Sequence, residues 1–454
     1  MTFIKPLTFS LLLFLGFICY SSGMLNLLQS ITLTITLATA VLWVTEWLPI
    51  PVASLLPLAL FPLAGVLSPD QVAVAYGNPL IILLLGGFLL SMAMSHTQTH
   101  RFLANRMIHA VGSDSPQRIL LSFMLSAFLL SMWISNTATT LMLLPIALAI
   151  IEQNNSRRFA IVLLLGIAYS ASIGGTATPI GTPPNLIMID NYMKVTGVEL
   201  GFTQWMAKVL PVVILFFPAM YLLLRSQLPK TAQPVEIEHH PMTVAQKRTL
   251  LVFAVTAVLW ITRTAPFGGW KQWFNLPYAN DASVALLAVV ALFVISDGRQ
   301  QKLLSWKTAN KIPWGILLLF AGGITIASAF KETGLSSLAA EQLTFLAGLP
   351  IWVIILTICL GITFLTEITS NTATTAIMMP ILAATAEAIN VEPLQLMLPA
   401  AISASCAFML PVATAPNAIV YGSEQVPIRS MMRQGFKLNL IGAVLITAIS
   451  SLLL

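Results

Sequence analysis

The sequence predicts an all-α polytopic membrane protein with about eleven transmembrane helices and two re-entrant hairpins, in two inverted repeats that each contain a broken helix. Three observations predict this class. The 454 residues are 57% hydrophobic and only 8% charged, whereas about 25% of residues are charged in a soluble protein. Apolar stretches of about 20 residues, the length that crosses a bilayer, recur along the chain. Four longer stretches carry polar or Pro/Gly-rich breaks in their middles, in two matched pairs.

The same composition excludes several other classes of protein. So few charges rule out a disordered chain, a secreted disulfide scaffold and a nucleic-acid binder, although the formal net charge is +6. The three cysteines lie inside apolar stretches without metal-ligand spacing. The sequence shows no nucleophile–base arrangement, metal-ligand cluster or phosphate loop. An enzyme embedded in the membrane is therefore a distant alternative.

Hydropathy predicts eleven crossings in order along the chain. They are residues 7–22, 26–45, 49–67, 78–96, 159–197, 205–224, 249–265, 281–296, 312–330, 393–423 and 435–453. The first could instead be a cleaved signal peptide, because Lys5 precedes an apolar run. No small-residue cleavage motif is clear around Ser21–Gly23, so we expect a retained N-terminal helix over residues 1–24.

Two stretches predict the re-entrant hairpins. Ile119–Ile151 carries no charge, and Gln342–Ala386 carries only Glu367. Each stretch is too long for one crossing and too short for two with a turn, and each holds the hexapeptide SNTATT in its middle. Polar, non-helical backbone at membrane depth survives only where it is buried in protein or lines a watery cavity. Both hairpin tips should therefore reach the bilayer midplane.

Two further uncharged stretches, 159–189 and 393–423, predict broken helices. The first is interrupted between Gly174 and Asn185, and the second between Pro411 and Asn417. Proline removes a backbone donor and glycine loosens a helix. Each crossing should therefore consist of two half-helices joined by unwound backbone.

The positions of the cations predict the orientation. With a cytoplasmic N-terminus and hairpins that do not cross, the C-terminus lies outside, and most of the 22 Lys and Arg residues fall on the cytoplasmic side. The outer side holds only Lys194, Lys208, Arg263, Lys271 and Lys331. We expect an integral protein of a bacterial inner membrane, surrounded by the lipid bilayer.

The two halves of the chain repeat each other in order. SNTATT occurs at Ser135–Thr140 and at Ser370–Thr375, and the pattern P-x-x-T-x-P-N ends at Asn185 and at Asn417. An odd number of crossings in each half inverts the second repeat, which is typical of secondary transporters. The expected divisions are an N-terminal helix at 1–24, scaffold parts at 25–114 and 249–346, transport parts at 115–228 and 347–454, and a cytoplasmic linker at 229–248.

The polar breaks offer ligands to both cations and anions. Asparagine presents a carbonyl oxygen to a cation and an NH2 group to an anion, and a hydroxyl serves either. Unwound backbone frees carbonyl oxygens, which small hard cations bind, while the helix N-terminus beyond each tip favours an anion. Ser131 and Thr366, each one helical turn before a tip serine, could add hydroxyl groups.

Two alternatives remain open at this point. Ser, Asn and Thr are also the preferred residues at helix N-termini, so the tip residues could simply cap helices. Glu367 could make a structural hydrogen bond or attract a cation, since a carboxylate inside a membrane is functional by default.

At these residues the chain resembles the divalent anion/sodium symporter family, the INDY-type di- and tricarboxylate carriers. The resemblance rests on the twin Ser-Asn-Thr signatures and on the run Leu398–Asn417, and it extends from about Leu25 to Leu454. It implies a homodimer whose scaffold domain supports a moving transport domain. It also implies a first sodium site at Ser131, Ser135, Asn136 and the backbone near Gly181, and a second at Thr366, Thr369, Asn371 and the backbone near Ala413.

The same resemblance implies a site for a dianionic carboxylate substrate. Its ligands would be Asn136, Thr137, Thr182, Pro183, Asn371, Thr372, Thr414 and Ala415. The chain departs from the family at two of these positions. The family often has Pro-Pro where this chain has Ala415-Pro416, and serine where it has Thr182.

We therefore expect sodium-coupled uptake of C4-dicarboxylates such as succinate, malate or fumarate, with at least two sodium ions and an elevator-type motion. The alternatives are a sodium-independent dicarboxylate exchanger of the same fold, a citrate symporter and a non-transporting receptor. The sequence does not determine the exact acid or the sodium stoichiometry.

Overall fold

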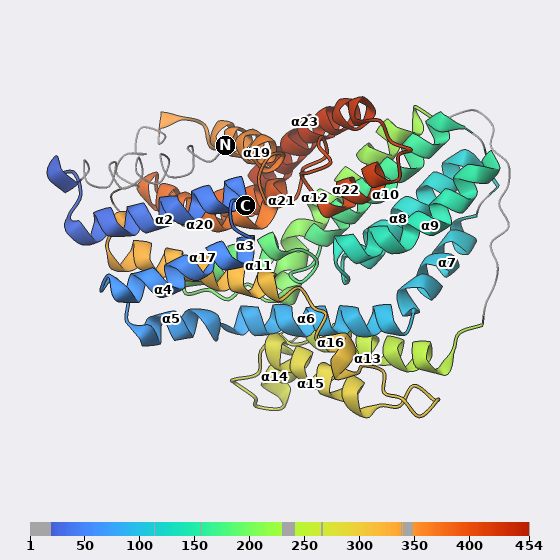
Figure 1. Ribbon diagram of the computed structural model, residues 1–454, viewed down its shortest axis with the longest axis horizontal. Coiled ribbons are helices and arrows are strands. Elements are labelled where there is room, and N and C mark those ends of the chain that lie inside the picture. Colours follow the sequence, from blue (N-terminus) through green and yellow to red (C-terminus); the bar gives the residue numbers. More distant parts are fainter. Residues whose placement is uncertain are drawn as a thin grey trace.

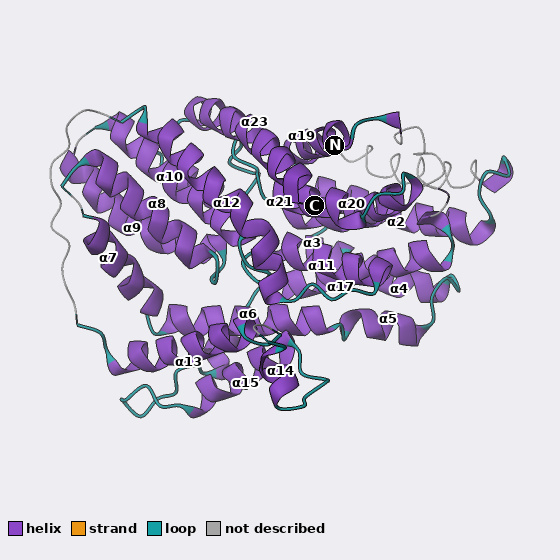
Figure 2. Ribbon diagram, turned by 180° about the vertical axis from the view of Figure 1, so that it is seen from behind, coloured by secondary structure: helices purple, strands orange, loops and turns teal. Residues whose placement is uncertain are grey.

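The computed structural model describes residues 20–112, 114–154, 156–228, 241–264, 267–336, 338 and 348–453. Within these ranges the regular structure is helical, apart from one isolated bridge between Ser296 and Lys302 (Figure 2). This confirms the predicted all-α class. Residues 7–19 of the first predicted crossing and residues 229–240 of the predicted linker lie outside the described residues, as does most of the segment 337–347.

The helices of the two repeats follow one another in the predicted order (Figure 1). The first repeat contains α2 (Leu27–Thr45), α3 (Ile50–Ala53), α4 (Leu55–Leu63), α5 (Pro69–Tyr76), α6 (Pro79–His96), α7 (Thr99–Val111), α8 (Pro116–Ser131), α9 (Asn136–Asn154), α10 (Arg157–Thr176), α11 (Pro183–Thr196) and α12 (Phe202–Arg225). The second contains α13 (Val244–Ile261), α14 (Gly269–Trp273), α15 (Asp281–Val294), α16 (Trp306–Ala309), α17 (Trp314–Glu332), α19 (Ile351–Thr366), α20 (Asn371–Ala388), α21 (Pro393–Ala404), α22 (Ala415–Gly422) and α23 (Ile428–Leu453).

By length and composition, 8 of the described helices could cross a membrane, and several shorter apolar helices accompany them. One of the 8, α9, is a hairpin arm. The predicted crossing at 49–67 contains α3 and α4, which meet at Ser54; because Ser54 itself has helical φ and ψ of −70° and −15°, the two form one apolar helical stretch, Ile50–Leu63. The predicted crossing at 281–296 forms a helix of 14 residues, α15.

Both predicted hairpins form. Helices α8 and α9 contact each other and are joined by residues 132–135, and α19 and α20 are joined in the same way by residues 367–370. Figure 1 shows α8 and α9 side by side. Each return arm begins at the asparagine of the repeated hexapeptide, so the most polar residues of each hairpin lie at its tip.

Both predicted broken helices form as well. The first consists of α10 and α11, separated by residues 177–182, and the second of α21 and α22, separated by residues 405–414. Proline occupies the first turn of α11 and of α22, where its missing N–H has no intrahelical partner to lose. The same residue type thus breaks the crossing and starts its second half.

The hairpins and broken helices interlock across the two repeats. Helix α9 contacts α10 of its own repeat and α22 of the other, and α20 correspondingly contacts α21 and α11. The protein core lies here: 94% of the α10 span is buried, compared with 17% of the α13 span in the predicted scaffold. These contacts place the two tips and the two breaks in one packed unit.

Paired glycines allow close approach in the predicted scaffold parts. A Cβ atom on Gly86 of α6 would lie 2.5 Å from Ala285 Cβ on α15, and one on Gly322 of α17 would lie 2.7 Å from the Ser54 carbonyl oxygen. The next glycine in each pair faces the other way. Gly87 lies against Ile180 in the first break, and Gly323 lies against Ala376 on α20.

A polar contact also links the two predicted parts. Asn78, which caps α6, donates its side-chain amide to Asp190 Oδ1 on α11 at 2.6 Å. Lys194 pairs with the second oxygen of Asp190 at 3.0 Å, and its ammonium group also donates to the Ile324 carbonyl on α17 at 3.4 Å. Asp190 is only 3% exposed, so its charge depends on two partners, Asn78 at the start of α6 and Lys194 of its own helix.

Candidate functional site

The first hairpin tip brings together an amide and a hydroxyl oxygen. The buried Ser131 hydroxyl donates to Asn136 Oδ1 at 2.5 Å. Gly175 leaves room for this pair, because a Cβ there would lie 2.5 Å from Asn136 Oδ1. A Cβ on Gly181 would in turn lie 2.3 Å from the Gly175 carbonyl oxygen. Three residues predicted for the first sodium site, Ser131, Asn136 and Gly181, therefore converge around Gly175.

Ser135 has a different local role. Its hydroxyl accepts the N–H of Ala138 at 3.3 Å, and its carbonyl accepts the N–H of Thr139. The side chain thus caps α9, which was the alternative interpretation of the tip residues. Capping and ion binding are not exclusive, since a hydroxyl oxygen has two lone pairs.

The second tip repeats the first arrangement at the matching positions. The Thr366 hydroxyl lies 2.5 Å from Asn371 Oδ1, and it also lies 3.1 Å from the Ala404 carbonyl at the end of α21. Thr366 is buried like Ser131. A serine hydroxyl in one repeat and a threonine hydroxyl in the other therefore make the same contact with the tip asparagine.

The other two residues predicted for the second sodium site, Thr369 and Ala413, form hydrogen bonds with residues outside the Thr366–Asn371 pair. The Thr369 hydroxyl donates to the Leu365 carbonyl at 2.8 Å and lies 2.6 Å from the Thr374 hydroxyl, so it is engaged within its own hairpin. Ala413 is buried in the second break, where its N–H donates to the Leu410 carbonyl.

All eight residues predicted for the carboxylate site lie at the starts of four helices. They are Asn136 and Thr137 of α9, Thr182 and Pro183 at α11, Asn371 and Thr372 of α20, and Thr414 and Ala415 at α22. The first N–H groups of a helix lack intrahelical partners, and each N-terminus carries about half a positive charge. Four such ends in one packed unit favour an anion.

Two asparagines that the sequence placed only in a repeated pattern hold the breaks in shape. The Asn185 amide donates to the Gly175 and Thr178 carbonyls at 3.0 and 2.7 Å. At the matching position, the Asn417 amide donates to the Ala407 and Leu410 carbonyls, both at 3.1 Å. Both asparagines are fully buried. They donate to carbonyls that have left the regular helical pattern, and so hold the backbone of each break in one conformation.

Each break is also hydrogen-bonded to the hairpin tip of its own repeat, through a hydroxyl in the first repeat and a carboxylate in the second. In the first repeat the Thr178 hydroxyl donates to the Met132 carbonyl. In the second, the carboxylate of Glu367 accepts the backbone N–H groups of Phe408, Met409 and Leu410 at 2.8–3.1 Å. Asn439 of α23 donates to the same carboxylate at 2.8 Å.

Glu367 therefore has the structural role that the sequence left open. It is 3% exposed and meets four N–H donors, so its oxygens are engaged in fixing the second break. The signal in the sequence was its position as the sole charge of a hairpin, but its partners could not be identified from that position.

The site segments contain no cationic side chain. Residues 131–137, 174–185, 366–372 and 405–417 hold no Lys, Arg or His. In the part of the chain that the structure describes, no three His, Cys, Asp or Glu residues cluster as metal ligands either. The ligands available at the tips are neutral oxygens and N–H groups, which suit a small hard cation and an anion.

Comparisons with known proteins agree with this arrangement. Residues 40–398 match the CitMHS family, described as citrate transporters. The chain is 39% identical to the sodium-dependent dicarboxylate transporter SdcS of Staphylococcus saprophyticus, over 92% of this chain and 84% of that protein. The chain belongs to the divalent anion/sodium symporter family. SdcS of Staphylococcus aureus strain USA300 is 38% identical, over 91% of this chain and 84% of the relative.

A solved structure shares the fold of this symporter-family chain. The YdaH transporter of Alcanivorax borkumensis superposes with a TM-score of 0.65, covering 87% of this chain and 89% of that one, at 14% sequence identity. Family membership confirms the resemblance seen in the twin Ser-Asn-Thr signatures and the prediction of an integral membrane transporter that is not an enzyme.

Proposed function

We propose that this protein couples sodium movement to the uptake of C4-dicarboxylates such as succinate, malate or fumarate. The observation that carries the proposal is the pair of matched clusters, Ser131 with Asn136 and Thr366 with Asn371, each at the tip of a hairpin where the return arm begins. The relatives named sodium-dependent dicarboxylate transporters support both the ion and the substrate class.

In this proposal each cluster holds one sodium ion as a transported partner of the substrate. The first site uses oxygens of Ser131, Ser135 and Asn136 with the backbone near Gly181. The second uses Thr366, Thr369 and Asn371 with the backbone near Ala413. The carboxylates meet the four helix starts, at Asn136, Thr137, Thr182, Pro183, Asn371, Thr372, Thr414 and Ala415.

The charge of the substrate explains the need for sodium. A C4 dianion brings two negative charges into a low-dielectric site, where an unpaired charge is costly. The site segments contain no cationic side chain, and helix N-termini supply only partial charges. Bound sodium ions supply the remaining positive charge, so the affinities for sodium and dicarboxylate rise together by the same factor.

Uptake of labelled succinate into proteoliposomes tests this function. We expect uptake to depend steeply on external sodium, with a Hill coefficient above one, and potassium should not replace sodium as the coupling ion. Persistent uptake in choline buffer with proton gradients collapsed would contradict sodium coupling. A requirement for internal dicarboxylate would then identify an exchanger.

Citrate is the second candidate substrate, because the matched family is described as citrate transporters. The site differs from the common family pattern at Thr182 and Ala415, and both lie at helix starts that would contact the substrate. Competition by unlabelled acids in the same uptake assay separates the candidates. Citrate that competes more strongly than succinate would replace the C4 acid.

We also propose an elevator-type motion, in which the transport parts 115–228 and 347–454 slide past the scaffold parts 25–114 and 249–346. The interlocked helices α9, α10, α11, α20, α21 and α22 support one moving unit. Gly87 and Gly323 support a smooth boundary, since neither carries a side chain where it meets the transport part.

Disulfide trapping tests the motion. In a protein without its native cysteines, a cysteine at Ala376 of α20 is paired with one at Phe320, Gly323 or Ala327, successive turns of α17. We expect crosslinks at two depths, with the balance shifted by sodium and succinate. If Ala376→Cys crosslinks to the same position of α17 under every condition, the sliding of the transport parts past the scaffold parts would be contradicted.

The remaining proposals concern assembly and orientation. We propose a homodimer formed through the scaffold parts, in a bacterial inner membrane with the N-terminus in the cytoplasm. The family resemblance and the uneven distribution of the cations support it. Light scattering in detergent measures the oligomer, and a mass of one chain would contradict the dimer.

A further inference from the structure

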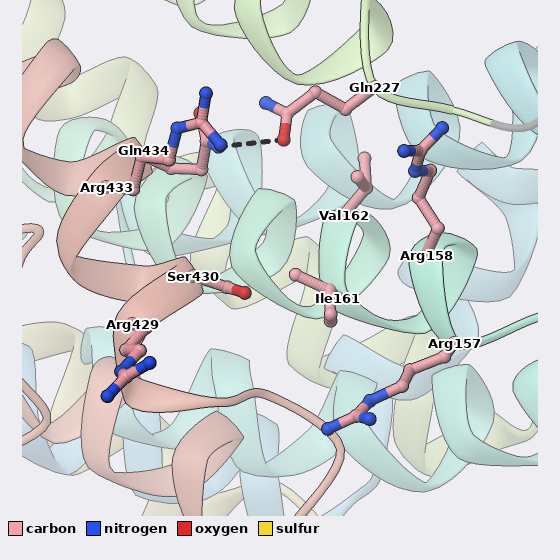
Figure 3. Close-up of a pocket in the computed structure, with 9 residues that line it drawn as sticks. All are labelled: Arg157, Arg158, Ile161, Val162, Gln227, Arg429, Ser430, Arg433 and Gln434. Carbon is pink, nitrogen blue, oxygen red and sulfur yellow. Dashed lines mark hydrogen bonds between the residues drawn. The ribbon is translucent and has the colours of Figure 1, made fainter.

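A basic cavity of about 450 Å³ lies at one end of the helix bundle. Four arginines line it: Arg157 and Arg158 at the start of α10, and Arg429 and Arg433 in the first turns of α23. Figure 3 shows the two pairs on opposite sides of the cavity, with Ser430 between them. The 20 residues of α10 separate the cavity from the first break by about 30 Å, so it is distinct from the proposed transport site.

The four arginines have no protein counter-charge in the described part of the chain. None of them forms an ion pair with a described carboxylate. The long helices α10 and α23 also both begin at this cavity, which adds partial positive charge from their N-termini. Four like charges so close together repel one another, and an anion bound between them would relieve that repulsion.

The cavity also offers a neutral polar wall. Gln434 is only 6% exposed, and its Nε2 donates to Gln227 Oε1 at 2.8 Å, which leaves one N–H of this amide for a ligand. The Ser430 hydroxyl lines the same space. A guanidinium group matches the oxygens of a phosphate in pairs, and the Ser430 hydroxyl and the second N–H of the Gln434 amide can donate to its remaining oxygens. This set of groups suits a phosphate better than a lone halide ion.

The surroundings of the cavity indicate the source of the phosphate. Helix α23 exposes an apolar stripe, one residue per turn, that starts beside the arginines and runs away from the cavity. The stripe consists of Ile428, Met432, Phe436, Leu440 and Val444, which are 39–59% exposed. Arg429 and Arg433 directly follow its first two members. A ligand with a phosphate and acyl chains would fill both features, and basic pockets between transmembrane helices bind such head groups.

We infer that this cavity binds the phosphate head group of an anionic phospholipid, whose acyl chains lie along the α23 stripe. The lipid would join α10 of the first repeat to α23 of the second, at the end of the bundle remote from the site. It would therefore stabilise the transport part whichever acid the protein carries, so the inference goes beyond the proposed function and does not depend on it.

Thermal unfolding of the detergent-solubilised protein tests this inference. Phosphatidylglycerol should raise the Tm in a saturable manner, whereas phosphatidylcholine should not. Arg429→Gln with Arg433→Gln should lose more than half of that rise. The matched control is Arg299→Gln with Lys307→Gln, which also removes two exposed positive charges but lies in the predicted scaffold; it should retain the rise.

Several outcomes would overturn the inference. An equal response of the two double variants would exclude the cavity as the lipid site. A rise of the same size with inorganic phosphate at a similar concentration would replace the lipid by a free anion. If the arginine variant does not fold, Ser430→Glu serves instead, because it places a carboxylate between the arginines and should abolish the rise; an undiminished rise in Ser430→Glu would contradict the site.

Discussion

Asn136→Ala and Asn371→Ala are each expected to reduce sodium-driven succinate uptake to near background. Each asparagine accepts a hydroxyl hydrogen bond from Ser131 or Thr366, and each is the first residue of a hairpin return arm. In the proposed site each also contacts a sodium ion and a carboxylate. Loss of a hydrogen bond to a charged group costs about 1.5–3 kcal/mol, and two lost contacts per variant correspond to a decrease of roughly 100-fold or more.

Uptake into proteoliposomes with matched protein content measures this effect. Asn191→Ala is the control, because Asn191 is also a buried asparagine of the transport part but bonds only to the Ile187 carbonyl within α11. It should retain most of the uptake. Near wild-type uptake by either tip variant would contradict the twin-tip site.

Glu367→Gln is expected to lower thermal stability and uptake together. The carboxylate now accepts four N–H groups, three from the backbone of the second break and one from Asn439. Glutamine keeps one acceptor oxygen but turns an NH2 group toward the remaining donors. At least one buried N–H then lacks a partner and the charge-assisted bonds are lost, at a cost of about 3–5 kcal/mol.

The Tm and the sodium dependence of the variant separate the two roles considered for this residue. A structural carboxylate predicts a fall in Tm, with a smaller fall in Asn439→Ala because that variant removes one donor of the four. A carboxylate that only attracts a cation predicts an unchanged Tm and a higher sodium concentration for half-maximal uptake. The second pattern would refute the role seen in the structure.

Much of the architecture could be predicted from the sequence because it depends on local patterns. The hairpin predicted at 119–151 is formed by the two helices within 116–154, and the hairpin predicted at 342–386 by the two helices within 351–388. Both return arms start at the asparagine of the repeated hexapeptide. The repeated hexapeptide supplies both the helix start and its polar side chains. Hydropathy and helix-start residues are local signals within about 20 residues, so they can be recognised in a single sequence.

The hydrogen bonds that hold the two breaks in place could not be predicted in the same way. The partners of Glu367 lie 41–43 and 72 residues further along the chain, so the sequence marks the carboxylate but not its donors. Asn185 and Asn417 bond to carbonyls of backbone that hydropathy describes only as interrupted.

The hydrogen bond between Asn78 and Asp190 sets a time scale as well as a position. It joins a predicted scaffold helix to a half-helix of the transport part, at 2.6 Å and largely away from water. Under the proposed sliding motion it breaks in every cycle. A bond to a charged group of about 1.5–3 kcal/mol lengthens the dwell in this state by roughly 10- to 100-fold, which single-molecule recordings would resolve. The turnover rate would then depend in part on a contact that neither the ion nor the substrate touches.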